Sequence, residues 1–175
     1  MAQQGNWGRT LRRMLKHRWL DVSDTRKAIP PDVAARLARS VAASEQRHSG
    51  EVRIYVEASL PMSYLWRDAA PRERAIAMFG KLRVWDTEHN NGVLIYLLLA
   101  ERAIEIVADR GLSSKVAAQD WQAMVDRMSS AFRAGRFEDG LTRAVDEVSA
   151  LLAVHFPLGS DEANPNELPD EPMLG

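Results

Sequence analysis

The sequence Val93-Leu94-Ile95-Tyr96-Leu97-Leu98-Leu99-Ala100 is an uninterrupted apolar run, and Asn91-Gly92 and Glu101-Arg102 bound it as turn residues. An apolar run this short, between turn residues, predicts a β-strand that is buried on both faces. Such strands occur where helices cover both sides of a sheet. The run therefore predicts an α/β fold.

Two further strands are predicted beside this run. Residues 51–57 alternate apolar and polar side chains, which is typical of a strand with one covered face. Residues 103–109 form the third strand, and the short turn at 101–102 makes that strand antiparallel to the run at 93–100. The sheet is therefore expected to be mixed.

The remaining pattern is helical. Apolar residues recur at three- and four-residue steps in segments that flank the strands, which predicts helices over 7–20, 31–48, 71–82, 114–134 and 138–155. The order of elements is α-α-β-α-β-β-α-α. This order predicts a small three-layer α/β/α sandwich around a mixed sheet of three to four strands.

Length and composition narrow the class of protein. The chain has 175 residues, 46% of them apolar, a formal net charge of −1 and no cysteine. The length predicts one domain. The missing cysteine excludes disulfides, thiolate metal sites and cysteine nucleophiles. The sequence has no apolar run long enough to span a membrane and no apolar leader segment, so a cytoplasmic location is expected.

Opposite charges gather near the two ends of the chain. Residues 1–20 contain five basic residues and no acid, whereas residues 158–175 contain five acids and no base. We expect a basic amphipathic N-terminal helix within 1–20, an α/β domain over 21–156 and an acidic, proline-rich, disordered tail over 157–175.

The helix predicted over 7–20 carries an apolar stripe formed by Trp7, Leu11, Leu15 and Trp19. The simplest expectation is that this stripe packs on the domain of the same chain. Two other interpretations remain open. The helix binds an anionic membrane surface, to which tryptophan beside arginine and lysine is suited, or it binds a protein partner. Nucleic acid is not an expected partner, because the domain shows no further surface of basic and aromatic residues.

Candidate ligands for a hard divalent cation precede the buried run. Asp86, Glu88 and Asn90 offer oxygen atoms suited to Ca²⁺ or Mg²⁺, and Asp109 follows the neighbouring strand as a fourth donor. The segment is not an EF-hand, because Leu97 stands where that loop requires a bidentate acid. A solvated loop explains the same residues through ordinary turn chemistry, so both interpretations remain open.

Arg110 adds a candidate anion-binding group next to these oxygens. Its guanidinium suits a phosphate, and a metal held by Asp86, Glu88 and Asp109 would supply the water for a metal-assisted phosphohydrolase. An adjacent Asp-Arg pair is also explained as a local ion pair or a helix cap. No catalytic residue is assigned, because the sequence contains no aspartyl-phosphate motif and no glycine-rich phosphate loop.

Several segments recur together in a characteristic order. They are Gly50-Glu51 before the alternating strand, Phe79-Gly80-Lys81-Leu82-Arg83-Val84-Trp85, Asn91-Gly92-Val93-Leu94-Ile95, Ile104-Glu105-Ile106, and Phe132-Arg133-Ala134-Gly135-Arg136-Phe137-Glu138-Asp139-Gly140-Leu141. In order and spacing they resemble the TPM domain family over residues 21–156.

The resemblance implies an α/β sandwich with a mixed sheet. For some members it also implies divalent-cation binding, usually of calcium, and an acid phosphatase activity. The main expectation is therefore a divalent-cation-binding interaction module that takes Ca²⁺ or Mg²⁺. A metal-assisted phosphohydrolase and a peripheral membrane-associated protein are the alternatives, because fold alone does not determine function.

Overall fold

A computed structural model describes residues 4–159 and 164–175, with side chains described from Leu11 onward. Its sheet has four strands in the order β3-β2-β1-β4. These strands are β1 (Val52–Glu57), β2 (Val93–Leu98), β3 (Ala103–Ala108) and β4 (Met173–Leu174). β1 is parallel to β2 and to β4, while β2 and β3 are antiparallel. The mixed sheet and the antiparallel hairpin are confirmed.

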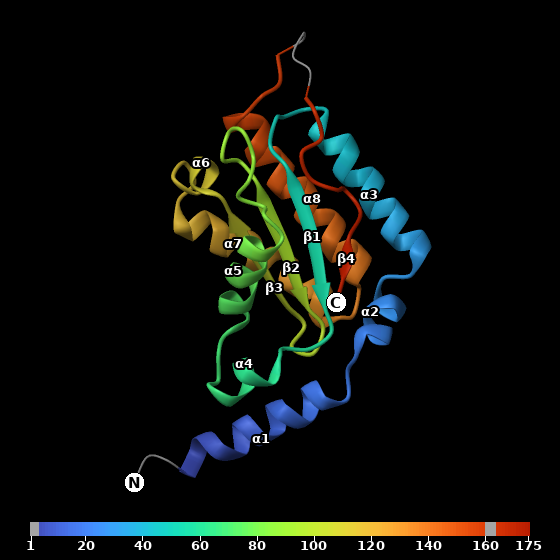
Figure 1. Ribbon diagram of the computed structural model, residues 1–175, viewed down its shortest axis with the longest axis vertical. Coiled ribbons are helices and arrows are strands. Elements are labelled where there is room, and N and C mark those ends of the chain that lie inside the picture. Colours follow the sequence, from blue (N-terminus) through green and yellow to red (C-terminus); the bar gives the residue numbers. More distant parts are fainter. Residues whose placement is uncertain (1–3, 160–163) are drawn as a thin grey trace.

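Helices cover both faces of the sheet. One face packs against α3 (Pro31–Glu45), α7 (Ala118–Arg133) and α8 (Phe137–His155). The other face packs against α4 (Met62–Trp66) and α5 (Pro71–Lys81). Figure 1 shows the sheet between these two layers, so the predicted three-layer α/β/α sandwich is confirmed.

The burial of β2 accounts for this arrangement. Every residue of β2 is buried, and its side chains alternate between the two cores. Odd-numbered residues join the core with α3, α7 and α8, whereas even-numbered residues join the core with α4 and α5. A strand whose side chains are apolar in both directions requires cover on both faces, which is what the continuous run at 93–100 predicts.

Proline and aspartate mark where several helices begin. α3 and α5 each begin at a proline, where the missing N–H would have no partner within the helix. The short α2 (Val22–Ala28) begins after Asp21, whose side chain accepts a hydrogen bond from the amide of Ser23 at 2.7 Å. A further short helix, α6 (Arg110–Ser113), follows β3 directly.

The first helix, α1 (Gln4–Arg18), lies beyond the end of the sheet, beside α4 (Figure 1). The expectation that its apolar stripe packs on the domain is wrong for the described side chains, because Leu11, Leu15 and Trp19 are all exposed. The side chain of Trp7 lies outside the described residues. α1 is instead held by Arg13 and His17 on its opposite side, which both contact the half-buried carboxylate of Glu101 on the domain.

The acidic tail also differs from its expected disorder over 157–175. Residues 164–175 run along β1 and end in β4 (Figure 1). The guanidinium of the buried Arg53 donates hydrogen bonds to the carbonyl oxygens of Pro169 and Glu171, the second at 2.9 Å. The tail is therefore fixed by backbone pairing to the edge of the sheet, which composition does not reveal.

Candidate functional site

Three chain segments meet at the end of the sheet where β1 and β2 begin and β3 ends, which we call the loop end (Figure 1, upper part). The amide of Val93 donates to the carbonyl oxygen of Glu51 at 2.8 Å. The amide of Asp109 donates to the carbonyl oxygen of Gly92 at 2.9 Å. The loop before β2 therefore lies between the start of β1 and the start of α6, and Asp109 lies at the end of the neighbouring strand.

Asn91 fixes this loop from inside. Its side chain is fully buried and donates to the carbonyl oxygen of Ser49 at 3.0 Å. Its backbone amide donates to the hydroxyl of Thr87 at 3.1 Å. From the sequence Asn91 is predicted to be a turn residue, whereas in the structure it links the loop to the start of β1.

Asn90 and Arg110 are in contact, as their predicted positions require. Asn90 has a φ of 52°, a conformation that asparagine tolerates better than most residues. Its carbonyl oxygen accepts a hydrogen bond from the amide of Gly111 at 2.9 Å, and a Cβ at Gly111 would overlap that oxygen. The guanidinium Nε of Arg110 donates to the side-chain oxygen of Asn90 at 3.2 Å. The amide oxygen proposed as a cation ligand is therefore shared with a guanidinium.

Asp109 has one free oxygen. Its Oδ1 accepts a hydrogen bond from the amide of Arg110 at 2.6 Å and thereby caps α6. Its Oδ2 is buried and has no hydrogen-bond partner among the described residues. A buried carboxylate oxygen without a donor is energetically costly, so this atom is suited to receive a ligand.

The other predicted ligands lie at the surface of the loop. Asp86 and Glu88 are exposed. The amide of Glu88 donates to the carboxylate of Glu167 at 3.0 Å, which brings an additional acid from the tail to this loop. Among the described residues, no three His, Cys, Asp or Glu side chains are grouped closely enough to hold a metal ion. Asp86, Glu88 and Asp109 thus share one end of the sheet without forming a preassembled cluster.

The family of the chain follows from this fold and its sequence. Residues 22–151 match the family model of the TPM domain. The chain belongs to the TPM domain family.

A solved structure has the same fold. The NMR structure of the BA42 protein from the psychrophilic bacterium Bizionia argentinensis matches this chain with a TM-score of 0.72. The match covers 84% of this chain and 95% of that one, and the two sequences are 24% identical. At that identity the likeness establishes the fold alone. No curated protein matches the chain. In the described part of this TPM domain, no helix has the length and apolar character needed to cross a membrane.

Two carboxyl groups are buried beneath the tail of this TPM domain. Glu45, at the end of α3, accepts a hydrogen bond from the amide of Val52 at 3.1 Å. Burial raises the pKa of Glu45 to about 8, and the nearby acids Glu51 and Asp170 add to that rise. Burial also raises the pKa of Glu51, whose Oε2 accepts from the amide of Leu168 at 3.1 Å.

Glu45→Gln tests this burial through the pH dependence of unfolding. The folded protein holds the Glu45 proton up to about pH 8, whereas the ordinary pKa is 4.5. This group's contribution to stability is therefore complete below pH 4.5 and is lost as the pH rises through 8. Glutamine cannot ionise and still accepts a hydrogen bond from the amide of Val52. We therefore expect the free energy of unfolding to fall by about 2 kcal/mol less in the variant than in the parent between pH 6.5 and pH 8. Urea unfolding at both pH values measures the difference.

Asp146→Asn, at an exposed carboxyl on α8, serves as the control and should leave the profile unchanged. His48 changes the stability in the opposite direction with pH, but only below the pH range of these measurements. Burial lowers the pKa of His48 to about 4 from 6.5. Its contribution to stability is present above pH 6.5 and is lost as the pH falls through 4. If Glu45→Gln and the parent respond identically between pH 6.5 and pH 8, the Glu45 carboxyl is not held protonated.

A groove of about 560 Å³ runs along the outer edge of β3, between α5 and α7. Its lining includes Arg72, Glu105, Trp121 and Val125. Arg72 lies 3.6 Å from the Glu105 carboxylate and donates a hydrogen bond to the carbonyl oxygen of Ile106. The sequence gives no signal for this groove, because β3 and α7 reach it from separate parts of the chain.

Proposed function

We propose that this TPM domain is a divalent-cation-binding interaction module that takes Ca²⁺ or Mg²⁺ at its loop end. The observation that carries the proposal is the buried, unpartnered Oδ2 of Asp109. Carboxylate and amide oxygens are the ligands that both ions prefer. Asp109 is the fixed ligand in this proposal, and Asn90, Asp86 and Glu88 are the ligands that the loop supplies.

The loop around these residues supports a binding role over a catalytic one. The loop is tied to the start of β1 through Asn91 and to α6 through Asn90, while Asp86 and Glu88 extend into solvent. An ion bound to Asp109 and to the exposed carboxylates fixes the conformation of the loop surface. A partner that contacts this surface then binds with an affinity that depends on the cation.

Calorimetric titration of Ca²⁺ and Mg²⁺ into the metal-free protein tests the proposal, with Asp109→Asn as the decisive variant. Asparagine retains an oxygen that caps α6, so the fold should persist. We expect saturable binding by the parent and an affinity lower by roughly tenfold or more in the variant. An ion at about one hundred times its dissociation constant should stabilise the parent by about 2.7 kcal/mol in parallel thermal melts.

Asp146→Asn is the matched control, because it removes one exposed carboxylate from α8 and should leave the titration unchanged. Equal affinities in the parent, in Asp109→Asn and in the control would remove Asp109 from the site. A flat titration of the parent would reject the cation-binding function.

A metal-assisted phosphohydrolase is the second candidate. Arg110 favours it, because an exposed guanidinium stands directly beside Asp109 and is oriented by Asn90. Arginine binds phosphate oxygens in a bidentate manner. Hydrolysis of a phosphomonoester that requires the cation and is lost in both Asp109→Asn and Arg110→Ala would support this activity. Cation binding without hydrolysis would reject the phosphohydrolase and retain the interaction module as the proposed function.

A further inference from the structure

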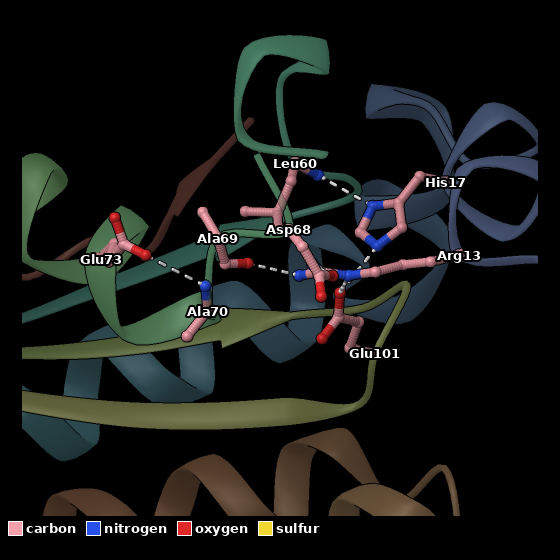
Figure 2. A network of polar contacts seen from close by, with 8 residues as sticks. All are labelled: Arg13, His17, Leu60, Asp68, Ala69, Ala70, Glu73 and Glu101. Carbon is pink, nitrogen blue, oxygen red and sulfur yellow. Dashed lines mark hydrogen bonds and ion pairs between the residues drawn. The ribbon is translucent and has the colours of Figure 1, made fainter. Parts of the chain in front are cut away.

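α1 is attached to the domain through one polar side. Arg13 donates to Glu101 at 2.6 Å, to Asp68 at 2.8 Å and to the carbonyl oxygen of Ala69 at 2.6 Å. Figure 2 shows Arg13 meeting Glu101 between the helix and the domain. These contacts link α1 to the segment that follows α4 and to the turn between β2 and β3.

His17 completes this attachment. The amide of Leu60 donates to its Nδ1 at 3.0 Å, so its Nε2 carries the proton that faces Glu101, also at 3.0 Å (Figure 2). His17 is only 3% exposed. Burial opposes ionisation of Glu101, but hydrogen bonds from His17 and Arg13 prevail and hold the pKa of Glu101 below its usual range. The helix is therefore docked in one rotational setting.

That setting turns the apolar stripe of α1 outward. Leu11 is 55% exposed, Leu15 is 51% exposed and Trp19 is 83% exposed. Helices on globular domains usually bury such a stripe and expose their charged side. In α1 the described residues of the stripe are exposed, whereas Arg13 and His17 face the domain and Met14 is partly buried against the core with α5. An exposed apolar stripe on a fixed helix indicates a surface that another body covers.

The neighbouring α4 extends this apolar surface. α4 contacts α1 and carries two more exposed apolar side chains, Met62 at 56% and Trp66 at 74%. Two exposed tryptophans therefore lie on this side of the protein, Trp66 at the end of α4 and Trp19 directly after the last residue of α1, and the two helices touch. Tryptophan is the residue type that favours the boundary between lipid headgroups and acyl chains.

The charges around the stripe are basic. Arg12, Lys16 and Arg18 are exposed, and no acid pairs with them in the part of the chain that the structure describes. Glu101, on the side of α1 that faces the domain, is already paired with Arg13 and His17. An apolar stripe flanked by unpaired basic residues is complementary to an anionic lipid surface.

We propose that the outward face of α1 and of the residue that follows it, formed by Leu11, Leu15 and Trp19 with Arg12, Lys16 and Arg18, docks on an anionic lipid bilayer. α1 lies in the plane of the interface and inserts its apolar stripe between headgroups, while the basic residues contact lipid phosphates. The loop end of the sheet faces away from the membrane, because α1 lies at the opposite end (Figure 1). The two surfaces therefore act independently.

Co-sedimentation of the full chain with lipid vesicles tests the proposal. One set of vesicles is pure phosphatidylcholine, and the other mixes phosphatidylcholine and phosphatidylglycerol in equal parts. We expect binding to the anionic set at low ionic strength and its loss as salt is raised. Leu15→Asp should lower the partition coefficient by roughly tenfold or more, since it places a carboxylate within the inserted stripe.

Matched variants separate this surface from general effects. Val154→Asp changes another exposed apolar residue, 72% exposed on α8, and should leave partitioning unchanged. Lys16→Gln should weaken partitioning by roughly fivefold. Arg39→Gln, at an exposed position of α3, should have a much smaller effect. Because these side chains are exposed, all four variants should unfold at the temperature of the parent.

Three results would overturn the proposal. The first is no partitioning on anionic vesicles at low ionic strength. The second is partitioning that Leu15→Asp and Val154→Asp reduce equally. The third is self-association without lipid that Leu15→Asp abolishes while vesicles remain unbound, which would assign the face to a second copy of the chain.

Discussion

Gly92→Ala is expected to lower the free energy of unfolding by about 3 kcal/mol or more, an unusually large effect for one methyl group. A Cβ at Gly92 would overlap the carbonyl oxygen of Val84, which lies against the start of β2. Val84 itself is fully buried in the core with α5, so its backbone has little room to move. The added methyl group therefore forces apart two segments that are both fixed.

Urea denaturation of the parent and the variant measures this difference, and Gly80→Ala is the matched control. Gly80 lies within α5, and a Cβ there would meet no atom within 4 Å. Alanine in a helix interior is favoured over glycine, so the control should be more stable than the parent by up to about 1 kcal/mol. If Gly92→Ala is as stable as the parent, the segment at Val84 is free to move away from β2.

The sheet and the helices that cover its two faces could be predicted, because burial produces a regular pattern of apolar residues in the sequence. The run at 93–100 is apolar at every position, and only cover on both faces explains that. The short turn at 101–102 predicted the antiparallel pairing of β2 and β3, which the structure confirms. The alternation at 51–57 predicted a strand with one covered face, and this is wrong, because every residue of β1 is buried and its polar side chains Arg53 and Glu57 have partners in the tail and in α5. These features depend on backbone geometry and on burial, which recur at short intervals along the chain.

The setting of α1 could not be predicted in the same way. Periodicity identifies the apolar stripe at Leu11, Leu15 and Trp19, and burial of that stripe is the usual outcome. Here one half-buried carboxylate, Glu101, accepts from both Arg13 and His17 and turns the helix over. That interaction joins residues more than eighty positions apart, so no local pattern encodes it.

The candidate site was predicted in part. The sequence placed Asp109 and Arg110 at the end of the strand next to the loop that holds Asn90, because β2 and β3 are joined by a short turn and their outer ends must meet, but it did not predict the hydrogen bond between Arg110 and Asn90. It missed Glu167, because the tail was expected to be disordered, whereas its carboxylate accepts from the amide of Glu88. It also missed the buried role of Asn91, whose side chain has its partner at Ser49. Both depend on tertiary contacts.

A second large loss of stability is expected from Arg74→Met. Arg74, on α5, donates to both oxygens of Glu57, at 2.9 Å from Nε to Oε2 and at 2.5 Å from its terminal nitrogen to Oε1. The hydroxyl of Tyr96 donates to Oε2 at 2.7 Å. The Glu57 side chain is only 7% exposed, so methionine at position 74 leaves a buried carboxylate without its counter-ion. We expect a loss of about 3–5 kcal/mol in the free energy of unfolding.

The double variant Glu57→Gln/Arg74→Met identifies the cause of that loss. Glutamine removes the charge and keeps an oxygen for the Tyr96 hydroxyl, so the double variant should be more stable than Arg74→Met alone.

Arg36→Met is the matched surface control. Arg36 pairs with Glu138 at 2.6 Å, but both side chains are more than a third exposed, so its removal should cost no more than about 1 kcal/mol. Urea unfolding of the four proteins at neutral pH measures these effects. Equal losses in Arg74→Met and Arg36→Met would mean that water screens the Glu57 carboxylate. A double variant no more stable than Arg74→Met would attribute the loss to packing of the Arg74 side chain on Tyr64, over whose ring its guanidinium lies at 5.5 Å.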